Sequence, residues 1–280
     1  MIKQNPFSVY DFLGYLIPGS LVIYSYLIID YLKNTDSFNS SEFIENFSNV
    51  KLEGVFFFVI ISYTIGHLIS YASSVTIEKY ANWRYSYPSK YLLNIEHKGY
   101  WKSSRNWKDV LWRIVMIIVL FPCVLFDWIF GQLLGFKRFY KKSLDEFLQD
   151  MVVSKANRLI DQLGLEKLEN PEKYDDGKGN NFDFHRIITH YAYENSKQHQ
   201  AKMSNYVALY GFLRTLSFIF SLLSTYFFIR VVCFLDFNLN NCIILFILTG
   251  ISYLSFMAFM KFYRRYTLEG LMIIVIDKEI

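Results

Sequence analysis

Cationic and aromatic side chains alternate along the segment from Lys79 to Trp112, a combination suited to binding phosphates. Lysine and arginine neutralise phosphate charge, and aromatic rings offer flat faces on which nucleobases stack. The same composition suits a membrane interface, where Trp and Tyr lie at headgroup depth and cations meet anionic lipid. Both interpretations stay open. The residues that we expect to hold an anionic nucleotide or oligonucleotide are Lys79, Trp83, Arg84, Tyr87 and Lys90. The next basic cluster is Lys137, Arg138, Lys141 and Lys142.

Polar side chains recur at helical spacing within two apolar runs, so each set occupies one side of a helix. Polar groups that face lipid lose their hydrogen bonds, and these stripes should therefore face protein or water. One interpretation is hydrogen bonding between helices. The other is a hydrated pore, which needs several copies of the chain because four helices can scarcely enclose one. The pore-lining candidates are His67, Ser70, Ser74, Arg214, Ser217 and Ser221.

Motifs of catalysis and metal binding are missing from the sequence. It has no Gly-rich phosphate loop, no nucleophile elbow and no His-Glu-x-x-His. His185 and His190 are five residues apart, which does not place them on one helical face. A lipid-headgroup enzyme would need paired carboxylates or a metal cluster, and Asp127 stands alone near its apolar run. We therefore expect neither enzyme activity nor a cofactor.

The composition is that of an integral membrane protein. The chain is 53% hydrophobic and only 19% charged, with a mean hydropathy of +0.19, whereas roughly a quarter of a soluble domain is charged. Crossing a bilayer takes about 20 apolar residues in a helix. The four runs that we expect to cross are Phe12–Ile29, Gly54–Ile77, Thr215–Ile229 and Cys242–Met260. A disulfide between Cys233 and Cys242 remains an alternative to free thiols.

Charge sets the orientation, because loops rich in Lys and Arg stay in the cytoplasm. Between Glu78 and Arg113 there are eight Lys and Arg side chains against three acidic ones, so this connection is expected inside. A fifth apolar run, residues 111–136, has only a short uncharged stretch, Ile114–Phe126, which Pro122 interrupts and Asp127 follows. The charge pattern is consistent only if this run makes no net crossing, as an interfacial or re-entrant helix. Both termini are then cytoplasmic.

The predicted organisation is all-α, with two transmembrane hairpins flanking a mainly helical insert. Residues 1–77 form the N-terminal hairpin, residues 78–205 the cytoplasmic insert, and residues 206–280 the C-terminal hairpin and tail. Within the insert, Ser143-x-x-Glu146 is typical of a capping box. From Phe184 the helical pattern runs without Pro or Gly to Gly211, which predicts a helix that continues into the third crossing.

Two stretches carry a family resemblance: Tyr10-Asp-Phe-Leu-Gly-Tyr-Leu-Ile-Pro-Gly19, and Gly66-His-Leu-Ile-Ser-Tyr-Ala-Ser-Ser-Val-Thr-Ile-Glu78 followed by Tyr87-Pro-Ser-Lys90. They resemble bacterial membrane proteins found beside anti-phage defence genes. The overall plan is similar to that of four-helix effectors of nucleotide-signalling defence systems, among them the Hailong-type channel effector. There, a partner nucleotidyltransferase makes a DNA oligomer that holds the channel closed.

The resemblance implies a regulated effector that depolarises the inner membrane when infection is sensed. The expected function is thus that of a homo-oligomeric, ligand-gated pore, controlled by a nucleotide or oligonucleotide and in contact with membrane lipid. The alternative is a membrane-anchored sensor or scaffold that recruits a soluble partner and conducts nothing. Ion flux on expression separates these two functions.

Overall fold

The computed structural model describes residues 9–34, 41, 52–95, 97, 99–104, 106–163, 184–233 and 237–278. Within these residues the chain is all α and contains no strand, as predicted. Its elements are α1 (Val9–Asp11), η1 (Phe12–Leu16), α2 (Ile17–Asn34), α4 (Leu52–Ser73), η2 (Ser74–Glu78), α5 (Lys79–Tyr85), α6 (Pro88–Leu92), α7 (Gly99–Lys102), α8 (Trp107–Val119), α9 (Phe121–Phe126), η3 (Asp127–Leu133), η4 (Phe136–Phe139), α10 (Glu146–Gln162), α12 (Phe184–Asn195), α13 (Lys197–Cys233) and α14 (Leu239–Ile276). Of the η elements, η4 is a 3₁₀-helix and the others are π-helices.

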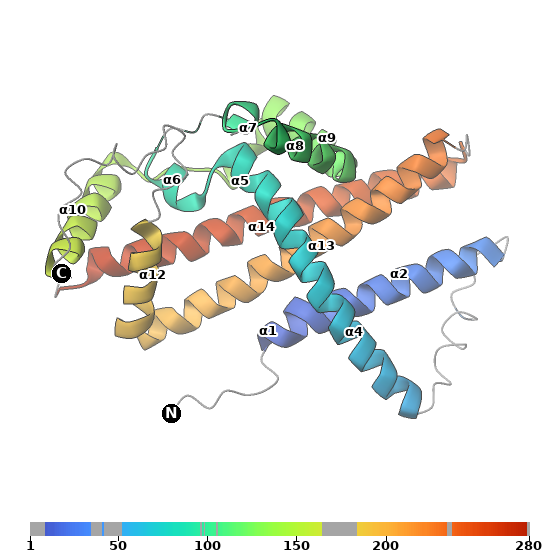
Figure 1. Ribbon diagram of the computed structural model, residues 1–280, viewed down its shortest axis with the longest axis horizontal. Helices are drawn as coiled ribbons and strands as arrows, with labels where there is room; N and C mark the ends of the chain where they lie inside the picture. The colour runs from blue at the N-terminus through green and yellow to red at the C-terminus, as the bar shows by residue number, and fades with distance from the viewer. Residues whose placement is uncertain are drawn as a thin grey trace.

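Four of these helices are long and apolar enough to cross a membrane, and they coincide with the four predicted runs. They are α2, α4, α13 and α14, with α2 and α4 extended by the adjoining helical segments. Figure 1 shows α13 and α14 side by side along their length, with α2 running in a similar direction and α4 crossing. Both predicted cytoplasmic termini, residues 1–8 and 279–280, lie outside the described residues.

Hydrogen bonds made by small polar side chains join α13 to α14. The Ser252 hydroxyl donates to the Ser217 carbonyl oxygen at 2.9 Å, and the hydroxyls of Ser224 and Thr249 bond to each other. Small side chains let two helix backbones approach closely, which increases van der Waals contact inside a bilayer. Cys242, at the start of α14, is a free thiol, so the alternative of a disulfide to Cys233 is wrong.

The N-terminal hairpin crosses at two glycines that leave no room for a side chain. A Cβ atom on Gly19 would overlap the carbonyl oxygen of Ser62, and one on Gly66 would overlap the carbonyl oxygen of Tyr15. The backbones of the two helices therefore touch at this crossing. Only glycine permits such an approach.

Residues 107–139 form an elbow, which we define as α8, α9, η3 and η4. Its two apolar arms, Trp107–Val119 and Phe121–Leu133, meet at 90°. Asn106 caps the first arm by accepting from the Asp109 amide at 2.9 Å. Pro122, in the first turn of α9, occupies the position where a missing N–H costs least. The bend therefore has a local cause in the sequence.

The elbow reaches along the α13–α14 pair and returns. At the bend, the ring of Phe121 lies 5.1 Å from that of Phe228 on α13, near the end where the chain passes into α14. Further on, Phe130 packs against Tyr253, and Tyr140, just after the elbow, packs against Phe256. The first arm lies at a similar level. Tyr80 contacts Phe256 of α14 and also contacts Tyr100, and the Tyr100 hydroxyl donates to the Arg113 carbonyl in the first arm. The chain thus enters and leaves at one level of the pair.

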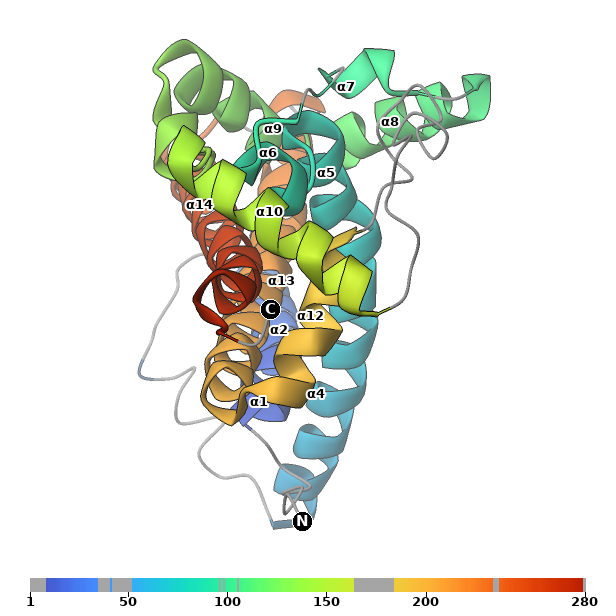
Figure 2. The same ribbon diagram turned by 90° about the vertical axis from the view of Figure 1, so that its left-hand side faces the viewer.

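The rest of the insert packs around the C-terminal half of α14. Leu92 on α6, Val152 and Leu159 on α10 and Ile188 on α12 form one buried cluster with Leu271 of α14. Figure 2 shows this group from the C-terminal end of α14, with α10 lying across it and α12 beside it. This cluster fixes the segments that surround the site described below.

Two predictions about local structure are wrong. The N-cap of α10 is Asp145, which accepts from the Leu148 amide at 2.9 Å, and Ser143 lies outside the helix. The predicted continuous helix from Phe184 is broken at Ser196. The Ser196 hydroxyl lies 2.8 Å from His199 Nδ1, and serine side chains that bond near a helix start compete with continued helix.

Candidate functional site

A basic pocket of about 710 Å³ opens beside the elbow. Its walls come from α5, α6, the segment that follows α6, and the stretch from η3 to Ser143. That volume is in the range of small-molecule sites, which is about 300–1,000 Å³. No acidic side chain is among its described lining residues. These are Arg84, Tyr85, Tyr91, Asn94, Ile95, His97, Gly99, Gln132, Lys137, Arg138, Lys141 and Ser143.

Four cationic side chains share this pocket: Arg84, Lys137, Arg138 and Lys141. Burial lowers the pKa of Lys141, and the charges of Lys137 and Arg84 lower it further. The cations thus repel one another, and a bound anion would relieve that repulsion. The pocket is therefore suited to an anion of several charges, and phosphate groups are the ligands that Lys and Arg clusters favour.

The five predicted ligand residues do not share one site. Of these, only Arg84 lines the pocket, while Lys79 is exposed outside it. Tyr87 lines a smaller cavity of about 270 Å³ between α12 and α14. Trp83 stacks on the Arg113 guanidinium, whose carbon lies 4.8 Å from a ring centroid. Lys90 is buried on α6.

The second basic cluster supplies three of the four cations that line the pocket. Lys137, Arg138 and Lys141 line the pocket, and Lys142 is exposed. Sequence analysis missed His97, Tyr85 and Gln132, which the fold brings to the same pocket. One signal was available, because Gly135 precedes this cluster; it adopts a positive φ of 77° between η3 and η4.

A buried carboxylate lies behind the pocket, on the returning arm of the elbow. Asp127 is fully buried and accepts hydrogen bonds from Tyr80 at 2.8 Å, Tyr85 at 2.6 Å and Tyr140 at 3.0 Å. We call these four residues the Asp127 cluster. Three hydroxyl donors satisfy the carboxylate without a cation, and the described residues contain no group that could hold a metal ion.

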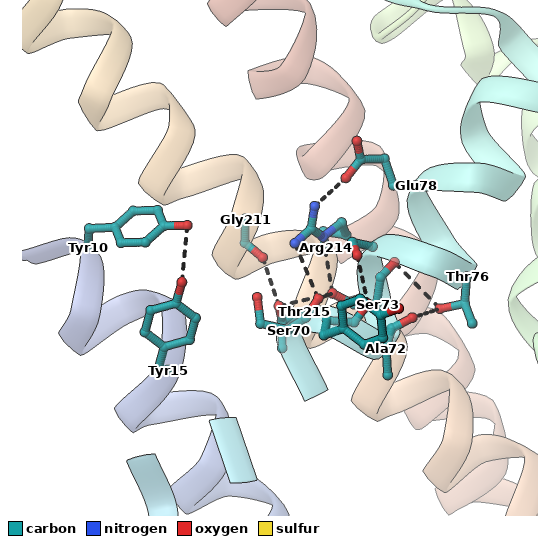
Figure 3. A network of polar contacts seen from close by, with 12 residues as sticks. Tyr10, Tyr15, Ser70, Ala72, Ser73, Thr76, Glu78, Gly211, Arg214 and Thr215 are labelled. Atoms are coloured by element: carbon teal, nitrogen blue, oxygen red, sulfur yellow. Dashed lines mark hydrogen bonds and ion pairs between the residues drawn. The ribbon is translucent and has the colours of Figure 1, made fainter. Parts of the chain in front are cut away.

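Arg214, a predicted pore-lining residue, makes its polar contacts within one protomer. Arg214 forms an ion pair with Glu78 and donates to the Ser73 hydroxyl at 3.0 Å and the Ser70 carbonyl at 3.3 Å. Figure 3 shows this network, with Ser73 also bonded to Thr215. The arrangement clamps α4 and η2 to α13.

The remaining lining candidates differ in their surroundings. Ser217 and Ser221 are fully buried on α13. His67 stacks on Tyr15, with ring centroids 3.6 Å apart, and Ser74 donates to the Tyr71 carbonyl on its own helix at 2.7 Å. Arg214 therefore makes the hydrogen bonds between helices of the first interpretation above, whereas Ser74 bonds within its own helix and the buried Ser217 and Ser221 hydroxyls have no hydrogen-bond partner among the described residues.

Acidification is expected to strengthen anion binding in the pocket. Burial, then the charges of Lys141, Arg113 and Lys90, lowers the pKa of His97, while its bond to the Trp83 carbonyl opposes this. A bound phosphate raises the pKa again, so binding takes up a proton. Affinity then increases as pH falls through the His97 pKa of the complex, and levels off below that of the free protein. Each unit between the two values is worth about tenfold in affinity.

Thymidine trinucleotide is the appropriate probe, because its phosphodiesters stay ionised between about pH 8 and pH 5.5, the range in which histidine titrates. Calorimetric affinities over this range should rise for the wild type and stay flat for His97→Gln. His190→Gln, in the smaller cavity, is the matched control and should keep the wild-type slope. A slope that survives in His97→Gln would contradict the assignment.

The comparisons with known proteins add no relative to this picture. No protein-family model matches the chain, and neither a curated protein nor a solved structure does.

Proposed function

We propose that this protein is a ligand-controlled effector of the bacterial inner membrane that forms a pore as a homo-oligomer. The controlling ligand is an anionic nucleotide or oligonucleotide held in the basic pocket. The observation that carries the proposal is the position of that pocket: four cations face a cavity whose wall includes Gln132 of the elbow. A ligand bound there contacts the segment that lies along α13 and α14.

The charge of the pocket supports a ligand with two or more phosphates. Among the described lining residues, four cations and no carboxylate leave an excess of positive charge that one phosphate does not balance. Asn94 and Ile95 line the same cavity and offer an amide and an apolar surface to a base. A partner nucleotidyltransferase would supply such a ligand, and release of the anti-phage response would follow from its presence or loss.

Conduction in this proposal requires several copies of the chain. The polar stripes of one protomer are closed by the Arg214–Glu78 pair and by burial of Ser217 and Ser221. Opening then means separating α4 from α13, which hydrates the Arg214–Glu78 pair. The exposed apolar surface of α4, including Phe56 and Phe57, is available to lipid or to a second copy. The Lys/Arg distribution supports a cytoplasmic location for the insert and both termini.

Replacing three pocket cations is expected to weaken binding of thymidine trinucleotide roughly 30-fold. The variant Arg84→Gln/Lys137→Gln/Lys141→Gln removes three charge contacts, each worth up to about 1 kcal/mol at a solvent-accessible site. Each lost phosphate contact also flattens the dependence of affinity on salt. The matched control is Lys79→Gln/Lys102→Gln/Lys142→Gln, in which all three cations are exposed and outside the pocket.

Ion flux from liposomes that contain the purified protein completes the test. The trinucleotide should change flux in the wild type and in the control triple variant, and should not in the pocket variant. Equal binding by both triple variants would contradict the pocket. Binding without any flux, under any ligand condition, would favour the non-conducting sensor or scaffold. Displacement of the probe by vesicles rich in anionic lipid would identify the pocket as a lipid headgroup site.

A further inference from the structure

We propose that the Asp127 cluster couples occupancy of the basic pocket to the position of the elbow. The inference rests on the proposed function, because it requires a ligand in that pocket. It adds a transmission route through Tyr85 and Gln132, and it assigns Asp127 the role of a positioning residue.

Tyr85 belongs to the pocket and to the cluster at once. It is among the residues that line the cavity, and its side chain is 1% exposed. Its hydroxyl lies 2.6 Å from Asp127 Oδ1 and 2.9 Å from the Tyr140 hydroxyl. A shift of Tyr85 at the pocket wall therefore changes the hydrogen bonding of the Asp127 carboxylate directly.

A second connection starts from a pocket cation. Lys137 Nζ donates to Gln132 Oε1 at 3.3 Å, and Gln132 Nε2 donates to the Tyr85 hydroxyl at 3.1 Å. A bound phosphate competes for Lys137, because a hydrogen bond to a charged acceptor is about twice as strong as one to a neutral amide. When Lys137 turns to the ligand, Gln132 loses its partner and the bonds around the Tyr85 hydroxyl rearrange.

The Asp127 cluster is too closely packed for its hydrogen bonds to rearrange without movement of the backbone. A Cβ atom on Gly131 would lie 2.6 Å from Asp127 Oδ1, 3.0 Å from the Tyr140 hydroxyl and 3.2 Å from the Tyr253 hydroxyl. Asp127 and Gly131 are part of the π-helix η3, a geometry that occurs frequently at functional sites. Closely packed groups move between discrete arrangements and do not deform continuously. A change in the bonds of Asp127 therefore shifts the arm that carries it.

The shift of this arm reaches the membrane helices through the bend. The Thr225 hydroxyl on α13 donates to the Val119 carbonyl at 3.2 Å, and the rings of Phe126 and Phe246 lie 5.7 Å apart. Both contacts involve the elbow near its bend. The route therefore runs from the pocket through Tyr85 and Asp127 to both α13 and α14.

The test compares two tyrosines of one pocket. Tyr85→Phe removes the hydroxyl that bonds to Asp127 and keeps the ring in the pocket wall. Tyr91→Phe is the matched control, since the Tyr91 hydroxyl is buried in the same pocket and has no hydrogen-bond partner among the described residues. Tyr80→Phe is the third variant, because Tyr80 bonds to Asp127 and does not line the pocket.

The position of the elbow is followed with a nitroxide at Leu125→Cys, with Cys233 and Cys242 replaced by Ser, in the full chain in liposomes. Accessibility of the label to oxygen and to a water-soluble relaxation agent is measured with and without thymidine trinucleotide. We expect the ligand to change this accessibility in the wild-type background and in Tyr91→Phe. The change should be lost in Tyr85→Phe and reduced at least twofold in Tyr80→Phe. The affinity for the trinucleotide should stay within about tenfold of wild type in all three variants. The ligand and the position of the elbow affect each other by the same factor, so losing the coupling changes the affinity by that factor only.

Each outcome decides between the coupling and the site. If the trinucleotide binds and moves the label equally in the wild type and Tyr85→Phe, the route through Tyr85 is wrong. If the trinucleotide binds but moves the label in neither the wild type nor Tyr85→Phe, the elbow is not coupled to the pocket, while the binding site itself is supported. If it does not bind the wild type, the proposed function fails first and the coupling with it.

Discussion

Gly66→Ala is expected to push apart the two helices of the N-terminal hairpin, with one of the largest losses of stability that a single methyl group can cause in this chain. The added Cβ would overlap the carbonyl oxygen of Tyr15, and a backbone carbonyl, unlike a flexible side chain, cannot rotate away. Overpacking of a close contact typically costs about 1–3 kcal/mol, and here we expect a value near the upper limit. Gly19→Ala, against the carbonyl of Ser62, should behave similarly.

The chain supplies its own controls for this substitution. Gly211 on α13 and Gly250 on α14 also lie inside long apolar helices, and a Cβ at either would meet nothing within 4 Å. Gly211→Ala and Gly250→Ala should leave the thermal midpoint unchanged or raise it slightly, because alanine favours helix more than glycine does. Midpoints in detergent that fall equally for all four variants would show that the tight crossing between Gly19 and Gly66 is not what distinguishes them.

Removal of Arg214 from its ion pair should also destabilise the protein strongly. Breaking a buried pair by deleting one partner costs about 3–5 kcal/mol, because the other charge is left in a poorly solvated place. The Arg214 and Glu78 side chains are 12% and 26% exposed, so we expect about 2–3 kcal/mol for Arg214→Gln. In the proposed effector, the same change loosens the clamp between α4 and α13, and ligand-independent ion flux should rise.

A double-mutant cycle isolates the pair. Glu78→Gln/Arg214→Gln should recover part of the loss caused by Arg214→Gln, since no unpaired charge remains. The exposed pair of Lys202 and Glu269, 3.1 Å apart with Lys202 61% exposed, is the control, and Lys202→Gln should cost under about 1 kcal/mol. Thermal midpoints of these variants check the prediction. A coupling near zero for Glu78 and Arg214 would mean that solvent reaches the pair.

The long helices could be predicted from the sequence, and the break between α12 and α13 could not. Length and apolar composition are local properties, and they were sufficient for α2, α4, α13 and α14. The break at Ser196 depends on its hydroxyl contact to His199, in a stretch with no Pro or Gly to mark it. The start of α10 was misplaced because Ser143 and Asp145 are both good caps, and only the bond from Asp145 to the Leu148 amide distinguishes them.

The pocket lay beyond sequence analysis for a different reason. It joins Arg84 and His97 to Lys137 and Lys141, and helical periodicity does not say which faces of separate segments meet. Lys79 and Arg84 are five residues apart in one basic stretch, and only Arg84 reaches the cavity. The carboxylate of Asp127 was noted as isolated because its partners Tyr80 and Tyr85 lie more than forty residues earlier.

The geometry of the elbow also constrains the order in which the protein is assembled. The elbow leaves the ribosome well before the helices that support its bend, since Val119 and its partner Thr225 are 106 residues apart. Non-helical backbone within a bilayer is tolerated only where other protein covers it. The bend at Leu120 has no such cover until α13 and α14 have been synthesised and inserted. In the proposed effector, an elbow that enters the bilayer as a re-entrant segment would therefore wait at the membrane surface during translation, and its descent along the finished helix pair would be a late, post-translational step.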